Sequence, residues 1–269
     1  MAETGTLEGK LEGKVAIVTG AGTEGDGVGI GRAIAMLLAG AGATVAAVDL
    51  FEDRASATVE MIEAEGGHGL AITADLSDVA ECQRVVDETI ARLGGVDILV
   101  NNAAMTLSAS VVDTTPEQLD RMLHTNLRAP FLLCRASIPN MVERGGGSIV
   151  NITSVAALRG QGGNGATAYA TAKSGMSGLT TDIADAWGAK GIRINLVAPG
   201  IIDTPIRANT IRAAGGDPAD YDLASKTCLN REGSSWDIAK AVLFLAGPDS
   251  AHVTGVLLPV DGGVLARSH

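Results

Sequence analysis

The chain has 269 residues, a length that suits one α/β domain with a sizeable hydrophobic core. Hydrophobic residues make up 46% of it but aromatic residues only 3%, and 35 glycines are present, which is typical of a doubly wound parallel sheet with tight turns. The formal net charge of −11 argues against nucleic acid and anionic membranes as partners.

The cysteines, the histidines and the first residues exclude several other classes of protein. Cys82, Cys134 and Cys228 are odd in number and far apart, so we expect reduced, buried thiols and neither a disulfide framework nor a zinc site. The scattered histidines predict no metal site. The acidic first residues lack an apolar signal segment, so we expect a cytoplasmic protein with a loose tail over residues 1–10 and a single domain over residues 11–269.

Short apolar runs and amphipathic segments alternate along the chain. Runs that predict strands cover residues 15–19, 44–49, 70–74, 97–101, 148–152, 193–198 and 256–260. Predicted helices cover residues 30–39, 53–65, a stretch from an N-cap at Ser77 to residue 93, a long helix that begins at Thr115-Pro116-Glu117, and residues 236–245. This alternation implies βαβ units, and it predicts a single-domain α/β fold with a seven-stranded parallel sheet and helices on both faces.

Two stretches need a separate interpretation. The uncharged residues 33–48 are too few to span a membrane and are interrupted by Gly40 and Gly42, so they predict a helix, a turn and a strand. Residues 201–231 show no clear periodicity and follow a predicted strand. Because ligands in doubly wound folds bind beyond the carboxyl ends of the strands, this segment is a candidate lid.

Tyr169 and Lys173 lie four residues apart, a spacing that places both on one face of a helix. Ser154 ends an apolar run earlier in the chain, and a phenol, an ammonium group and a hydroxyl at a strand end would form a proton-transfer site. A free phenol has a pKa of about 10, but an ammonium group about 4 Å away would favour the phenolate by roughly 4 kcal/mol, or about three pKa units. The sequence therefore predicts that Lys173 brings the pKa of Tyr169 close to neutrality.

A glycine-rich turn follows the first predicted strand and opens the first helix. Gly20, Gly29 and Gly31 would let the backbone approach a pyrophosphate at the helix N-terminus, although such a turn can also be a bare connection. Asp49 ends the second predicted strand, 20 residues after Gly29. It is either a helix cap or a carboxylate that holds the ribose hydroxyls of adenosine.

Further motifs follow the predicted strands in a fixed order. With the Thr19-Gly20 and Gly29-Ile30-Gly31 turn and the Tyr169/Lys173 pair, they make the chain resemble a compact, single-domain short-chain dehydrogenase/reductase over about residues 10–264. The resemblance implies a Rossmann-type fold. The other motifs that carry it are Asp75-Leu76, Asn101-Asn102-Ala103-Ala104, Asn126, Ser154, Pro199-Gly200-Ile201-Ile202-Asp203-Thr204 and Val260-Asp261-Gly262-Gly263.

The resemblance implies a role for each catalytic candidate. Tyr169 would be the general acid and base, and Lys173 would lower its pKa and hold the nicotinamide ribose. Ser154 would hydrogen-bond the substrate oxygen. Asn126 would fix a water that relays protons from Lys173, although such an amide can also bond locally inside its helix.

The resemblance also implies NAD as the cofactor. A 2′-phosphate beside Asp49 would be repelled by about 2–4 kcal/mol, so we expect NAD rather than NADP. Asp75 and Leu76 would flank the adenine, and Thr204 would hold the carboxamide unless it is a simple cap before Pro205. The full set of expected cofactor contacts is Gly20, Gly29, Ile30, Gly31, Asp49, Asp75, Leu76, Asn102, Ala103, Tyr169, Lys173, Pro199, Gly200, Ile202 and Thr204.

The chain departs from the family pattern in three places. The glycine turn is five residues longer over residues 23–28, and we expect residues 23–27 to bulge into solvent because Glu24 and Asp26 would repel a pyrophosphate. The loop 157–168 carries Arg159, Gln161 and Asn164, which are candidates for substrate contacts. Ala104 stands where the family usually has glycine, which we expect to alter only local packing.

We therefore expect an NAD-dependent oxidoreductase that interconverts a small-molecule secondary alcohol and a ketone, without a metal. The alternatives are a 3-oxoacyl-thioester reductase-like enzyme, an epimerase or dehydratase that uses NAD transiently, and a non-catalytic nucleotide-binding regulator. Small residues over 166–178 and the apolar residues 256–265 resemble family surfaces that build tetramers, so we expect a homotetramer.

Overall fold

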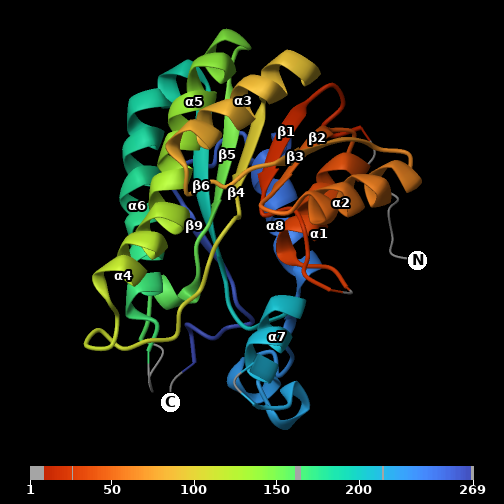
Figure 1. Ribbon diagram of the computed structural model, residues 1–269. Coiled ribbons are helices and arrows are strands. Elements are labelled where there is room, and N and C mark those ends of the chain that lie inside the picture. The colour runs from red at the N-terminus through yellow and green to blue at the C-terminus, as the bar shows by residue number, and fades with distance from the viewer. Residues whose placement is uncertain (1–8, 26, 161–164, 214, 268–269) are drawn as a thin grey trace.

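The computed structural model describes residues 9–25, 27–160, 165–213 and 215–267. Its centre is a sheet of seven parallel strands in the order β3-β2-β1-β4-β5-β6-β9 (Figure 1). The predicted sheet is therefore confirmed. The strands are β1 (Val15–Thr19), β2 (Thr44–Asp49), β3 (His68–Thr73), β4 (Ile98–Asn101), β5 (Gly147–Ile152), β6 (Ile192–Pro199) and β9 (Leu257–Val260).

Helices cover both faces of the sheet, as predicted (Figure 1). One layer holds α1 (Ile30–Gly40), α2 (Glu52–Ala64) and α8 (Ser235–Ala246). The other layer holds α3 (Val79–Leu93), α5 (Ala129–Glu143) and α6 (Thr167–Trp187), with α4 (Pro116–Leu123) beside α6.

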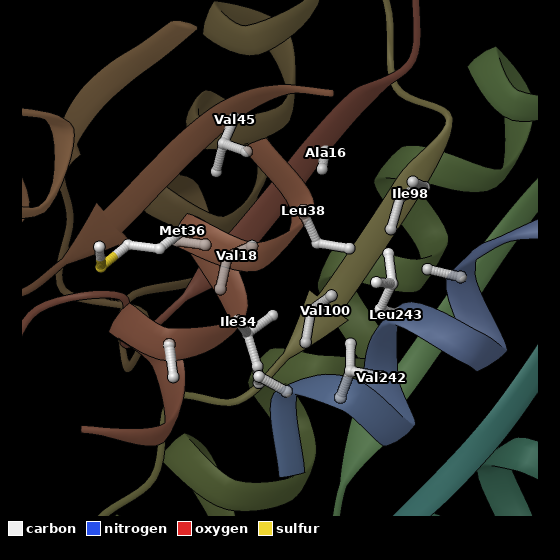
Figure 2. Packing of buried hydrophobic residues seen from close by; sticks show 14 of the residues in the cluster. Ala16, Val18, Ile34, Met36, Leu38, Val45, Ile98, Val100, Val242 and Leu243 are labelled. Carbon is white, nitrogen blue, oxygen red and sulfur yellow. The ribbon is translucent and has the colours of Figure 1, made fainter. Parts of the chain in front are cut away.

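Successive residues of β1 pack into opposite layers because side chains alternate along a strand. Ala16 and Val18 join a cluster with Ile34 and Leu38 of α1 and Val242 of α8, as Figure 2 shows. Ile17 packs into the second cluster, on the side of α3 and α5. Burial on both faces explains why the predicted strands read as continuous apolar runs.

Two predicted elements differ from the structure. The N-cap of α3 is Asp78, whose carboxylate accepts from the Ala80 N–H at 2.9 Å, and not Ser77. Ser77 belongs to a preceding turn, where its N–H donates to the Asp75 carboxylate at 2.9 Å.

The aperiodic segment 201–231 contains β7 (Ile202–Asp203), which pairs with β8 (Gly233–Ser234), and α7 (Pro205–Ala213). In α7 the isoleucines at 206 and 211 are five residues apart, so they form no helical stripe.

Other expectations about the chain were met in part. Residues 1–8 of the predicted tail lie outside the described residues, while Leu11 is buried and its N–H donates to the Ala41 carbonyl at 2.8 Å. Cys82 and Cys134 are buried, and burial raises their pKa to about 11 and about 12, respectively. Cys228 is exposed, so the prediction that it is buried was wrong. None of the helices in the described ranges is long and apolar enough to cross a bilayer.

Candidate active site

A cavity of about 1410 Å³ lies at the carboxyl ends of β1 to β6. Segments that follow each of these strands supply its walls, as the doubly wound topology requires. Of the residues that the sequence singled out for catalysis or cofactor contact, all except Asn126 line it.

The glycine turn after β1 leaves no room for side chains. Gly20 has a φ of +60°, which favours glycine, and a Cβ on Gly31 would lie 1.9 Å from the Gly20 carbonyl oxygen. The N-cap of α1 is Gly29, which has no side chain to cap the helix, and no acidic residue occupies the first turn. Bare N–H groups at a helix N-terminus attract an anion, so this turn fits a pyrophosphate.

The long insertion in the glycine turn bulges only in part. Glu24, Gly25 and Gly27 are exposed, as predicted, and residue 26 lies outside the described residues. Thr23 is 9% exposed, and its hydroxyl accepts from the Gly29 N–H at 3.0 Å. The prediction was wrong for Thr23, because its hydroxyl satisfies a helix N-terminal donor and its side chain packs under the turn.

The carboxylate of Asp49 lies at the end of β2, in the cavity wall. It accepts from the Gly22 N–H at 2.9 Å and from the Phe51 N–H at 3.2 Å, so the backbone fixes its direction. Arg54 lines the same wall, stacks over the Phe51 ring at 4.1 Å from its centroid, and lies 3.8 Å from the Glu24 carboxylate. A cation and two carboxylates therefore lie at this end of the cavity.

Asn102 joins the end of β4 to the glycine turn. Its side-chain NH₂ donates to the carbonyls of Thr19 and Gly20 at 3.0 and 2.9 Å. The Thr19 hydroxyl accepts from the N–H groups of Asn102 and Ala103, both at 3.0 Å. These bonds hold the floor of the cavity rigid.

Ser154, Tyr169 and Lys173 meet beyond the carboxyl end of β5. Ser154 follows the strand and caps a short helical turn, η2 (Val155–Ala157), by accepting from the Ala156 N–H at 3.1 Å. Lys173 is 1% exposed, and its ammonium group donates to the Ile152 carbonyl at 2.7 Å. The Thr153 hydroxyl donates to the Lys173 carbonyl at 2.9 Å, which fastens α6 to the end of the strand.

The expected lowering of the Tyr169 pKa does not occur in this structure. Burial raises the pKa of the phenol above its ordinary value, and a hydrogen bond with Ser154 opposes that rise. Burial also lowers the pKa of Lys173 to about 7. The Lys173 nitrogen lies 5.9 Å from the Tyr169 ring centroid. An amine with that pKa carries only part of a positive charge at neutral pH, so it cannot supply the full attraction that the sequence argument assumed.

Asn126 lies outside the cavity wall, in a π-helical turn, η1 (His124–Arg128), that joins α4 to α5. Its side chain is buried, accepts from the Met105 N–H at 3.0 Å and donates to the Met105 carbonyl at 2.9 Å. The amide of Asn126 is therefore engaged with the backbone of Met105 and with the Met122 sulfur, to which its NH₂ donates at 2.9 Å.

The wall near β6 contains the remaining predicted contacts. Pro199 ends β6, and a Cβ on Gly200 would lie 2.6 Å from the Asp261 Cα. Ile202 is 6% exposed, and the Thr204 hydroxyl accepts from the Arg207 N–H at 3.4 Å, so Thr204 does act as a cap before α7. Arg159 also lines the wall, whereas Gln161 and Asn164 fall outside the described residues.

The chain is similar to known proteins over nearly its whole length. A family model described as Enoyl-(Acyl carrier protein) reductase matches residues 25–265. An uncharacterized short-chain type dehydrogenase/reductase of Sinorhizobium fredii is 37% identical over 256 residues, which cover 95% of this chain and 98% of that protein. The chain belongs to the short-chain dehydrogenase/reductase family.

Two solved structures resemble this short-chain dehydrogenase/reductase along nearly its whole length. A blue fluorescent protein from a metagenomic library, in complex with NADPH, is 40% identical with a TM-score of 0.84 and covers 95% of this chain and 99% of its own. A 7α-hydroxysteroid dehydrogenase complexed with NADH and 7-oxo glycochenodeoxycholic acid is 36% identical with a TM-score of 0.86 and covers 98% of both chains. The two carry different nicotinamide coenzymes, so the choice between them depends on this chain's own residues.

Several wall residues of this short-chain dehydrogenase/reductase escaped the sequence reasoning. Thr23 could have been identified from the sequence, because a hydroxyl side chain in a glycine turn can accept from an N–H at the start of the following helix. No local signal marks the others, because tertiary folding alone brings them to the cavity: Arg121, Lys226, Val264 and Arg267. Within the described residues no cluster of His, Cys, Asp or Glu could hold a metal ion.

Proposed function

We propose that the protein is an NAD(H)-dependent oxidoreductase that interconverts a secondary alcohol and a ketone. The observation that carries the proposal is the meeting of Ser154, Tyr169 and Lys173 at the end of β5, in a cavity large enough for a coenzyme and a substrate. A nicotinamide coenzyme would supply the group that accepts or donates hydride.

In this proposal the chain's own residues handle the proton. The Tyr169 phenol donates its proton to the substrate oxygen in reduction and recovers it in oxidation. Ser154, whose hydroxyl opposes the rise in the pKa of that phenol, holds the substrate oxygen beside it. Lys173 has a pKa of about 7 and can exchange a proton at neutral pH, so it can return the phenol to its starting state.

A panel of secondary alcohols and ketones, followed at the NADH absorbance band, tests the proposal. Tyr169→Phe should lower turnover by about 10²–10⁴-fold and leave NADH affinity nearly unchanged, because it removes only the proton donor. Near-normal turnover in that variant would contradict the role of Tyr169. An epimerase or dehydratase would give product without steady NADH release, a regulator would give no turnover, and a thioester reductase would favour 3-oxoacyl thioesters over simple ketones.

The preference for NAD over NADP is part of the same proposal. Asp49 faces the cavity with a fixed carboxylate, and Glu24 adds negative charge nearby. Arg54 is the cation that would favour a 2′-phosphate, but it lies against Glu24 and the Phe51 ring. Two carboxylates against one cation favour the ribose without a phosphate.

The ratio of kcat/KM for NAD and NADP on one substrate tests this preference. We expect the parent to favour NAD by at least about tenfold and Asp49→Ser to shrink the ratio, since about 2–4 kcal/mol of repulsion is removed. Equal use of the two coenzymes by the parent would mean that Asp49 does not meet the ribose.

Two further features belong to the proposal. Residues 201–231, which contain α7, would act as a lid, and NADH should then protect them from limited proteolysis. The small residues of α6 and the apolar C-terminal segment would build a homotetramer. A monomer mass by light scattering at micromolar concentration, with activity retained, would refute the tetramer.

A further inference from the structure

The two ends of the cavity carry opposite charge. Acidic residues outnumber basic ones in the chain, 31 to 20. Of the acidic residues among the described wall residues, Glu24 follows β1, Asp49 ends β2 and Asp75 follows β3. The wall beyond β4, from Asn102 to Arg267, includes no described Asp or Glu. Its basic residues are Arg121, Arg159, Lys173, Arg207, Lys226 and Arg267.

Two of these basic residues are already accounted for. Lys173 belongs to the proton-transfer site, and Arg207 pairs with Asp203 at 3.1 Å and with Glu232 at 2.5 Å. Arg121, Arg159, Lys226 and Arg267 form no ion pair with any residue that the structure describes. An acidic protein therefore has a cavity end lined by cations without a described ion pair, and the Asp222 carboxylate, outside the wall, interacts with the charge of Lys226.

The C-terminal segment gathers three of these cations. Arg159 donates to the Val264 carbonyl at 2.8 Å. Arg267 donates to the carbonyls of Ser225 and Thr227, the residues on either side of Lys226. Three segments far apart in the sequence thus place basic side chains on one part of the wall.

This cationic wall lies close to the reacting groups. The backbone N–H of Arg159 donates to the Val155 carbonyl at 3.1 Å, and Val155 follows Ser154 directly. The pyrophosphate of a coenzyme would lie at the N-terminus of α1, beside Gly20 and Gly31, where the basic wall residue Arg54 already lies 3.8 Å from the Glu24 carboxylate. The cations therefore face the substrate and not the coenzyme phosphates.

We propose that the substrate carries an anionic group, which Arg159 binds with Lys226 and Arg267 while the carbon that reacts lies against Ser154 and Tyr169. This inference rests on the proposed oxidoreductase function. The guanidinium of Arg159 uses Nη1 for the Val264 carbonyl, so its other N–H groups remain to bind a carboxylate or phosphate. The shared chemistry is that of a hydroxy or oxo compound with an anionic group.

Matched pairs of charged and neutral probes test the proposal. The carboxylate arm compares 4-oxopentanoate, 5-oxohexanoate and 7-oxooctanoate with their methyl esters, and the phosphate arm compares dihydroxyacetone phosphate with dihydroxyacetone. Binding to the enzyme with NAD is measured by calorimetry, and turnover with NADH by absorbance. We expect at least one anion to bind about tenfold or more tightly than its neutral partner, a difference of about 1.4 kcal/mol, with the effect on turnover appearing in KM.

The variants separate this anion site from general effects of charge. Arg159→Gln should reduce the ratio of anion to neutral affinity by at least about fivefold, and Lys226→Gln provides a second test if the first variant folds poorly. Arg135→Gln removes the same charge from an exposed position on α5, outside this cavity, and should leave the ratio unchanged. A ratio near one for every pair in the parent, or a ratio that Arg159→Gln and Lys226→Gln do not alter, would overturn the inference. Anion-selective binding without turnover of any probe would support the anion site and overturn the oxidoreductase function.

Discussion

Lys173 and Asp97 are both buried charged residues, at opposite edges of the sheet, and their surroundings differ. Asp97, just before β4 at the amino edge, accepts from the Val15 N–H at 2.9 Å and pairs with Arg144 at 2.8 Å and Lys14 at 3.4 Å. Lys173, at the carboxyl edge, donates to one backbone carbonyl, and no carboxylate forms an ion pair with it within the described ranges.

The pKa values follow from these surroundings. Burial alone would raise the pKa of Asp97, but the hydrogen bonds from Arg144 and Val15 outweigh burial and lower it. Nothing offsets burial at Lys173, and its pKa falls to about 7. A fully paired buried charge supports the fold, whereas a buried charge without a counter-charge costs stability and can exchange a proton at neutral pH.

The largest expected effect comes from removing the unpaired charge. Lys173→Met should lower turnover by about 10²–10⁴-fold, because the proton route to Tyr169 is lost. Its free energy of unfolding should not fall, since a buried amine is replaced by an apolar side chain of similar length. Steady-state kinetics and urea unfolding of the same preparation measure both. If Lys173→Met unfolded more easily than the parent and remained active, Lys173 would support the fold as Asp97 does, and the contrast between the two residues would be wrong.

The paired charge should show the opposite pattern. Asp97→Asn should lower the free energy of unfolding by about 2–4 kcal/mol, because it leaves Arg144 near a neutral group at a buried site. Turnover at a temperature where the variant is folded should stay within about twofold of the parent. Lys14→Met is the matched control, since Lys14 is half-exposed and its pair with Asp97 should contribute less than about 1 kcal/mol.

The pH dependence of stability should also distinguish Asp97 from Lys173. The pKa of Asp97 is lowered in the folded chain, so its contribution is present above the unfolded pKa of about 3.9 and is lost as pH falls through the folded value. The pKa of Lys173 is lowered from 10.5 to about 7, so the unfolded chain binds more protons between these values and stability should rise with pH across that window. Unfolding curves between about pH 7 and pH 10 should show this rise in the parent and a smaller one in Lys173→Met.

The sequence was sufficient where a local pattern carries the information. The strand positions and the Tyr169/Lys173 helix followed from apolar runs and from a spacing of four. The Asp78 cap, the buried Thr23 and the exposed Cys228 depended on which neighbours fold against them, and no local pattern records that. The pKa of Tyr169 was misjudged for the same reason, because the depth of burial became known only with the fold.

The cationic wall could not be predicted from the sequence alone. Arg159 was noticed because its loop is long, but Lys226 and Arg267 are separated from it by many residues and share no motif with it. Their approach depends on the C-terminal segment bonding to Arg159 and to the turn that holds Lys226. Such a site becomes visible only when the whole domain is assembled.

The π-helical turn at His124–Arg128 also has a consequence for insertions and deletions in related sequences. A π turn holds one residue more than an α turn, and each residue advances an α-helix by about 100°. Deleting one residue here would rotate the start of α5 relative to α4. The apolar face of α5, which includes Leu133, Ile138 and Met141, would then turn away from the sheet. Related sequences should therefore carry insertions or deletions in this helix pair only where these keep both the π turn at His124–Arg128 and the packing of α5 against the sheet.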